Sequence, residues 1–389
     1  MGRPMYYFDW TATSPISQNS LNTYCEVASQ YIGNPSSTHP LGQKAKERLE
    51  AERSSTASVL GVKPSEIFFT SGGTESDSII LSSLFNSPSP GEIITTGIEH
   101  SAILEWKKTL ETAGWTFTAL TCPGGYLDPE TLQEALNEKV RMVCFMKVNN
   151  VTGTILDTKT LVRTIRDYEK KSGRKIHIHC DAVQALGKIP FNPASEDLDS
   201  AAFSAHKFCG PRGVGILYCR SKAIASLSRG GGQEKGLRPG TENLAAICAM
   251  NTALKDSIAQ ITCKFDEILG YRRKIEKAAL DNGYTLISPS CDSNLAYSPY
   301  IINICSKPIP SEVFLRVLSD KGFCLSAGSA CSSNSRGKAE SVLAAMNIDH
   351  SIRMSSIRIS MGSTTTEEEV NLLCSALASA SRELGIIRN

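Results

Sequence analysis

The strongest constraint on the fold is a regular alternation of short β-rich runs and longer helical patterns, which begins near residue 65. The runs have the length of strands, and the stretches 101–114 and 160–173 place apolar residues at helical spacing and end on Gly. Such alternation predicts a parallel sheet covered by helices. Strands are expected at 66–70, 92–96, 117–121, 142–148, 175–181, 200–205 and 214–219.

The pattern changes in the last third of the chain. A long helical stretch leads there to a Ser/Pro-rich region, to strands at 300–305 and 355–360, and to a C-terminal helix that opens with a capping-box pattern. We therefore predict an α/β protein. A large domain with a mostly parallel sheet would cover 15–254, and a smaller α+β domain would cover 255–389 together with residues 1–14.

Composition excludes several classes of protein. The chain has 41 Lys and Arg against 39 Asp and Glu, so its charge of +2 gives no strong field for nucleic acid or an anionic membrane. No apolar run approaches the ~20 residues that span a bilayer. The 13 Cys contain no C-x-x-C pair, which argues against a zinc ribbon or a redox dithiol. We expect a cytoplasmic protein without a membrane segment or a direct nucleic-acid partner.

The segment FTSGGTES (69–76) places Gly73 and Thr74 where a strand gives way to a helix. Backbone N–H groups at a helix N-terminus can cradle a phosphate. Ordinary capping of the helix by Thr74 explains the same residues, and from this fragment alone it is the commoner outcome.

The segment KIHIHCD puts His177, His179 and Asp181 on one face of a strand. Three interpretations are open: core histidines with satisfied hydrogen bonds, a metal site, or an acid beside the cationic ring of a cofactor. A metal is the least favoured, because zinc and iron need further ligands nearby. We expect no metal.

The segment SAHKFCGP brings Ser204, His206 and Lys207 to the end of an apolar strand. In a pocket, desolvation lowers the pKa of a lysine and leaves the amine able to bond to an aldehyde. A solvated surface lysine is the alternative.

Together, these segments supply the parts that hold pyridoxal 5′-phosphate. Lys207 would hold the aldehyde, and Asp181 would keep the ring nitrogen protonated so that the ring withdraws electrons. His100 would stack on the face of the ring, and Asn150 and Gln184 would hydrogen-bond the ring hydroxyl. The phosphate would be bound by Gly73, Thr74, Ser204 and His206.

Six motifs resemble, in order, those of the NifS-like cysteine desulfurases of the class V aminotransferase family: FTSGGTES, GIEHSA, VNN-x-TG, HCDAVQ, SAHKFCGPRGVGILY and GGGQEKGLRPGTEN. The resemblance begins at YFDWTATSP and continues through AGSACSS and SSIRISMG, so it covers nearly the whole chain. It implies the fold-type I transferase fold of pyridoxal-phosphate enzymes. It also implies conversion of L-cysteine to L-alanine, and AGSAC favours this desulfurase activity over transamination.

The same resemblance assigns four further residues. Cys331 would accept the sulfur as a persulfide, on a Ser/Gly-rich segment typical of a mobile loop. Arg358 and Asn34 would bind the substrate carboxylate. Thr241 would reach the phosphate site of the neighbouring subunit, which implies a homodimer. The sulfur recipient would be an iron–sulfur scaffold protein or a tRNA-thiolation relay.

The sequence also departs from the family pattern. Val151 stands where Glu is usual, Ser363 where Arg is common, and Trp10-Thr11 interrupt the usual start. Two alternatives follow: another class V reaction, such as selenocysteine cleavage or transamination, or a degenerate homologue that only binds proteins. Alanine formed together with an enzyme persulfide would separate the first alternative from a desulfurase, and a yellow purified protein would exclude the second.

Overall fold

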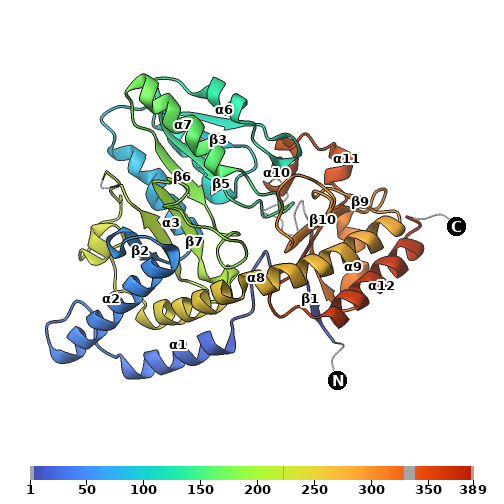
Figure 1. The fold of residues 1–389 in the computed structure, drawn as a ribbon, viewed down its shortest axis with the longest axis horizontal. Helices are drawn as coiled ribbons and strands as arrows, with labels where there is room; N and C mark the ends of the chain where they lie inside the picture. The colour runs from blue at the N-terminus through green and yellow to red at the C-terminus, as the bar shows by residue number, and fades with distance from the viewer. Residues whose placement is uncertain (1–3, 222, 328–337, 387–389) are drawn as a thin grey trace.

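The structure is a computed structural model that describes residues 4–221, 223–327 and 338–386. Its larger part is built on a seven-stranded sheet in the order β2-β8-β7-β6-β5-β3-β4 (Figure 1). β8 runs antiparallel to both of its neighbours, and the other pairs are parallel. The expected mostly parallel sheet is confirmed. Its strands are β2 (Ile67–Thr70), β3 (Glu92–Thr96), β4 (Thr116–Leu120), β5 (Val140–Met146), β6 (His177–Asp181), β7 (Ser200–Ser204) and β8 (Gly215–Cys219).

Both faces of this sheet are buried, because successive strand residues point to opposite sides. Ile93 and Met142 belong to one apolar cluster, while the residues that follow them, Ile94 and Val143, belong to the other. The expected helix over 101–114 is divided at Glu105 into two short helices. The helices of this part are α1 (Gln18–Gln30), α2 (Pro40–Leu60), α3 (Gly73–Ser82), α4 (Ser101–Leu104), α5 (Trp106–Thr112), α6 (Pro129–Ala135) and α7 (Thr158–Ser172).

The smaller part is an antiparallel four-stranded sheet in the order β12-β13-β10-β9. Thr366 and Glu369 form the predicted capping box at the start of the last helix. The elements are β9 (Thr285–Leu286), β10 (Ile301–Cys305), α9 (Ser311–Asp320), β12 (Ser326–Ala327), α10 (Lys338–Ala345), α11 (His350–Arg353), β13 (Ser356–Ser360) and α12 (Glu367–Glu383).

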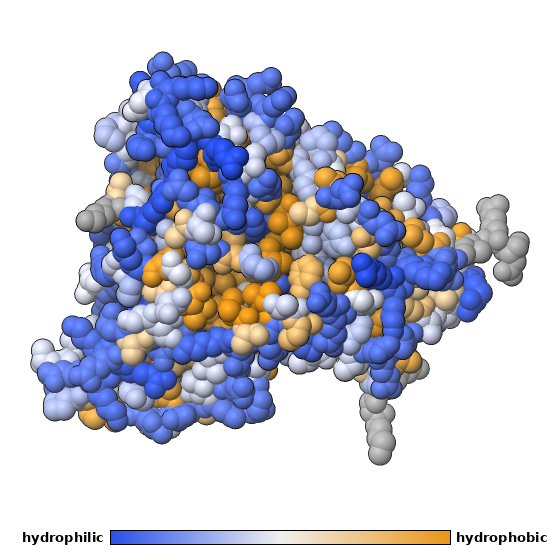
Figure 2. Space-filling model, in the orientation of Figure 1, coloured by the Kyte–Doolittle hydropathy of each residue, from blue (hydrophilic) through white to orange (hydrophobic). Residues whose placement is uncertain are grey.

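Two stretches of chain connect the parts. Helix α8 (Leu244–Asp281) is 38 residues long and continues from the large sheet to the small one (Figure 1). Because it runs without interruption through residue 254, the domain limits proposed from the sequence remain a prediction. Figure 2 shows hydrophobic side chains gathered just above the middle of this helix, with polar side chains over most of the surrounding face.

The second connection is the N-terminal segment. Strand β1 (Tyr6–Tyr7) pairs in parallel with β11 (Phe323–Cys324), and Asp9 forms a bridge with Ser360. The segment then crosses to the large sheet, where the Ser14 N–H donates to the His206 carbonyl at 2.8 Å. The N-terminal segment therefore contacts both the small part and the large sheet.

A buried ion pair fixes the loop that follows β8. The guanidinium of Arg53 donates to both carboxylate oxygens of Glu234, at 2.7 and 2.8 Å, and the Phe69 N–H donates to the same carboxylate at 2.9 Å. Glu234 is therefore anchored although its φ of 48° lies in the left-handed region. Within the described ranges, no helix is both long and apolar enough to cross a bilayer.

Candidate active site

A cavity of about 350 Å³ opens at the carboxyl ends of the parallel strands of the large sheet. Ligand sites of α/β proteins are found at this edge because the loops that follow several strands meet there. The predicted residues that line the cavity are Gly73, Thr74, His100, Asn150, Asp181, Gln184, Ser204, His206, Lys207 and Arg358. Further lining residues are Thr11, Ala12, Asp77, Met146, Val148 and Val183.

Lys207 follows β7 in a short 3₁₀ turn, and its Nζ donates to the carbonyls of Thr11 at 2.6 Å and Ala12 at 2.7 Å. Burial and, to a smaller extent, the nearby cation Arg358 lower the pKa of this amine to about 8, while Asp181 acts against the shift. A lysine in this state has a much larger fraction of reactive, uncharged amine near neutral pH than an ordinary lysine.

Asp181 ends β6 and lies in the cavity wall, 7% exposed. One of its oxygens, Oδ1, accepts the N–H of Val183 at 3.0 Å. The neighbouring Gln184 amide donates to the Thr11 carbonyl at 3.1 Å and accepts from Nζ of Lys188 at 2.7 Å. Burial lowers the pKa of Lys188 to about 7. The acid and the amide are thus both held by side-chain or backbone contacts before any ligand binds.

The turn before α3 requires glycine. Gly72 is the N-cap, with a φ of 154° that suits glycine, and a Cβ on Gly73 would meet Val183 Cγ2 at 2.5 Å. The interpretation of Thr74 as the N-cap is therefore wrong, because the helix starts one residue before it. The first N–H groups of α3 face the cavity without an intrahelical partner.

His206 and His100 both line the cavity. His206 hydrogen-bonds through Nδ1 to Thr13 Oγ1 at 3.1 Å, and burial lowers its pKa to about 4, so the ring is neutral. His100 is the N-cap of α4, and its Nδ1 accepts the Ala102 N–H at 3.1 Å. The neutral His100 ring therefore carries its proton on Nε2.

Arg358 projects from β13 of the small sheet into the same cavity. Its Nη1 donates to the Asn150 carbonyl and its Nη2 to Asp9 Oδ1, both at 3.0 Å. Among the described residues, two buried atoms of this wall have no hydrogen-bond partner: Nε of Arg358 and Oδ1 of Asn150. Such orphaned groups are costly unless a ligand satisfies them.

Three predicted residues are not in the lining. Asn34 is exposed, and its side chain accepts the Ser36 N–H at 2.9 Å. Thr241 is also exposed, on the loop anchored by Glu234. Cys331 lies outside the described residues. The roles of these three residues stay predictions.

The histidines of the H-x-H-x-D face bind protein groups. Ser200 Oγ lies 2.8 Å from His179 Nδ1 and 2.7 Å from His177 Nε2, and His179 Nε2 lies 3.0 Å from Asp77 Oδ1. Burial lowers the pKa of both rings to about 4. Across 4–221, 223–327 and 338–386, no three His, Cys, Asp or Glu side chains are grouped as a metal ion would require.

Sequence reasoning missed Asp77 and the two carbonyls on Lys207. Asp77 lies four residues after Gly73, and this spacing puts both on the same face of a helix, so a signal was available. Thr11 and Ala12 act through backbone carbonyls from the far end of the chain, which no side-chain pattern reveals.

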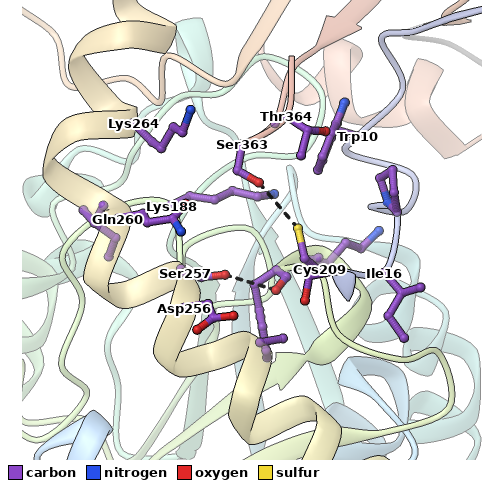
Figure 3. Close-up of a pocket in the computed structure, with 18 of the residues that line it drawn as sticks. Trp10, Ile16, Lys188, Cys209, Asp256, Ser257, Gln260, Lys264, Ser363 and Thr364 are labelled. Carbon is purple, nitrogen blue, oxygen red and sulfur yellow. Dashed lines mark hydrogen bonds between the residues drawn. The ribbon is translucent and has the colours of Figure 1, made fainter. Parts of the chain in front are cut away.

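A second cavity, of about 290 Å³, lies beside the first and shares Lys207 with it. In Figure 3 it is enclosed by α8 residues, including Ser257 and Lys264, on one side and by Ser363 and Trp10 on the other. Cys209 lies at its centre, with Sγ 3.7 Å from Ser363 Oγ. Two of the positions where the sequence departs from the family pattern therefore border this cavity.

The comparisons with known proteins agree with this geometry. The family model described as "Aminotransferase class-V" matches residues 6–373. A NifS/IcsS protein homolog of Lactobacillus delbrueckii subsp. bulgaricus is 39% identical over 94% of each chain. Cysteine desulfurase IscS of Dictyoglomus turgidum is 35% identical over 94% of this chain and 91% of its own. Among solved structures, a NifS-like protein superposes with a TM-score of 0.89 at 33% identity, over 98% of this chain and all of that one.

Proposed function

The chain belongs to the class-V aminotransferase family and is a cysteine desulfurase, and from this premise we propose how its own residues do the work. The proposal is that pyridoxal 5′-phosphate occupies the cavity around Lys207, that L-cysteine is converted there to L-alanine, and that Cys331 receives the sulfur. One observation supports this proposal above the others. Lys207, with its lowered pKa, lies in the same cavity as Asp181, the acid at the end of the adjacent strand.

The described residues fit this cofactor. The glycine turn before α3, with Ser204 and the neutral His206 beside it, offers donors for the phosphate. Asp181 offers a carboxylate for the ring nitrogen. The buried Oδ1 of Asn150, which has no partner in the described parts of the chain, would accept the hydrogen of the ring hydroxyl.

Each residue then has a separate task. When bound, the cofactor supplies an electron-withdrawing ring that stabilises negative charge on the substrate carbon attached to the amine. Lys207 Nζ takes the proton from that carbon and returns it, because its lowered pKa makes the neutral amine available. His100 would lie against the face of the ring, and with Nδ1 accepting the Ala102 N–H it would have its Nε2 hydrogen available for the substrate.

Arg358 would bind the substrate carboxylate. Its free Nε and its Nη groups form a planar fork, the geometry that a carboxylate matches with two hydrogen bonds. Asn34 would assist at the same group. Cys331 would attack the substrate sulfur, so that a sulfur–sulfur bond forms while the carbon–sulfur bond breaks and the carbon takes up a proton to give alanine.

The wider context is also part of the proposal. The enzyme would act in the cytoplasm as a homodimer in which Thr241 reaches the phosphate of the neighbouring subunit. It would pass its sulfur to an acceptor protein, either an iron–sulfur scaffold or a tRNA-thiolation relay. A similar solved structure is described as SspA in complex with cysteine, at 26% identity and a TM-score of 0.76, which is consistent with a cysteine substrate here.

The test is a product analysis. The purified protein, loaded with pyridoxal 5′-phosphate, is incubated with L-cysteine, and alanine is measured together with the sulfide released by a reductant. We expect alanine and sulfide in equal amounts and a persulfide on Cys331. A keto acid in place of alanine, or turnover with selenocysteine and none with cysteine, would contradict the proposal.

A further inference from the structure

Asp77 is a buried acid on the floor of the cavity that the mechanism above does not use. It lies on the first turns of α3, is 1% exposed, and lines the cavity together with Asp181. Its Oδ1 contacts Nε2 of His179 at 3.0 Å, and its Oδ2 is buried without a partner. Among the described residues no Lys or Arg is paired with it. An ionised carboxylate in this position would be poorly compensated.

The hydrogen bonds beyond His179 fix where the protons lie. Ser200 contacts both His179 Nδ1 and His177 Nε2, but it has only one hydrogen to donate. If that hydrogen goes to His177, the His179 ring donates from Nδ1 to Ser200, and its bare Nε2 must accept a proton from Asp77. If it goes to His179, the ring donates from Nε2 to Asp77 Oδ1, so Asp77 is either ionised or protonated on Oδ2, where the hydrogen would have no partner among the described residues.

Electrostatics decide between the two patterns. Burial raises the pKa of Asp77 well above its usual value, and the neighbouring charge of Asp181 raises it further. Glu99 is a further buried acid near this group, and burial, together with the charges of Asp181 and Asp77, raises its pKa to about 8. Burial keeps the His179 ring neutral, so the group in contact with Asp77 Oδ1 carries no positive charge, and among the described residues no Lys or Arg forms an ion pair with Asp77. The first pattern, with a protonated Asp77, is therefore the stable one.

The hydrogen bond between Asp77 and His179 joins two elements of the cavity wall. Asp77 is on α3, whose first turn forms the phosphate cradle, and His179 is on β6, two residues before the acid for the ring nitrogen. The bond thus ties together the two elements that would hold opposite ends of the cofactor. We propose that Asp77, as the hydrogen-bond donor to His179, is a positioning residue that sets the spacing between the phosphate cradle and Asp181. This inference rests on the proposed binding of pyridoxal 5′-phosphate.

The test compares two variants of similar shape, Asp77→Asn and Asp77→Leu. The amide of Asn can still donate to His179 Nε2, whereas Leu cannot. For the wild type and both variants, dissociation constants are measured for pyridoxal 5′-phosphate and for pyridoxal, which lacks the phosphate. We expect Asp77→Asn to keep the gain in affinity that the phosphate provides and Asp77→Leu to reduce that gain about tenfold, as loss of a buried hydrogen bond would.

The possible results distinguish the positioning role, the protonation of Asp77 and the binding of the cofactor. Equal weakening of both ligands by Asp77→Leu would overturn the positioning role, and equal loss in both variants would overturn the protonated state. A wild-type protein that bound pyridoxal 5′-phosphate no better than pyridoxal would instead refute the proposed function. If Asp77→Leu does not fold, ¹⁵N spectra of wild-type histidines decide, because we expect the His179 hydrogen on Nδ1. A hydrogen on Nε2 would overturn the proposal.

Discussion

The lowered pKa of Lys207 leads to a prediction that can be tested without substrate. The amine has a pKa of about 8 instead of 10.5, because it is buried and lies near Arg358. At pH 7 about one amine in ten is then uncharged, against roughly one in three thousand for an ordinary lysine. The neutral fraction, and with it the reactivity, should be about 300 times larger.

Trace acetylation of the cofactor-free protein measures this fraction. The protein is labelled with a small amount of acetic anhydride at pH 6 to 11, and the label on Lys207 is quantified by mass spectrometry against free acetyl-lysine amide. Labelling should rise with pH and reach half its maximum near pH 8, whereas the reference reaches half its maximum near its ordinary pKa. A Lys207 curve that followed the reference up to pH 10 would refute the electrostatic argument.

Two variants serve as controls, because they should shift the midpoint of the Lys207 labelling curve in opposite directions. Arg358→Gln removes a cation that lowers the pKa of Lys207, so the midpoint should move to higher pH. Asp181→Asn removes an anion that raises it, so the midpoint should move to lower pH. Shifts in the same direction would show that the variants act by disturbing the fold and not by their charge.

Four further predictions follow from the site and its supports. Lys207→Ala should leave no cofactor attached to the chain after borohydride reduction, as judged by peptide mass, and attachment at another lysine would contradict the assignment. Cys331→Ser should keep the absorption of the bound cofactor and its change on adding L-cysteine, yet form no persulfide and almost no alanine over many turnovers. Asp181→Asn should lower kcat while the phosphate still binds, so bound phosphorus per chain should be unchanged. Glu234→Ala should cost about 3 kcal/mol in urea unfolding, since it leaves the buried Arg53 charge with only the half-exposed Glu50 as an ionic partner, and a loss below about 1 kcal/mol would count against the buried pair.

Much of the fold could be predicted from the sequence, because the signals are local. Apolar runs such as MVCFM become β5, and the Thr-Glu pattern near residue 366 becomes a capping box. The division of the expected helix at Glu105 could not be predicted, since apolar spacing continues across it. The start of the long helix α8 at Leu244 could not be predicted either, because it lies ten residues before residue 254, the expected end of the large domain.

Some residues of the site could likewise be predicted from the sequence, and others could not. Lys207, Asp181 and the Gly73 turn follow directly after strands, so a parallel sheet brings them together without further information. Arg358 and the carbonyls of Thr11 and Ala12 come from distant parts of the sequence, and only tertiary packing places them beside Lys207. Periodicity within a single chain says nothing about such contacts.

The N-terminal segment has a consequence for how the enzyme is made. Its contacts with β13 join residues 349 positions apart, such as Asp9 and Arg358. A ribosome that adds about 5–20 residues per second needs roughly 20–70 s to produce that intervening chain. During this time Thr11 and Ala12 lack the partner strand that holds them against Lys207. The catalytic lysine therefore acquires its final surroundings only when synthesis is nearly complete, and a nascent chain cut short before β13 should be inert even though its large sheet is intact.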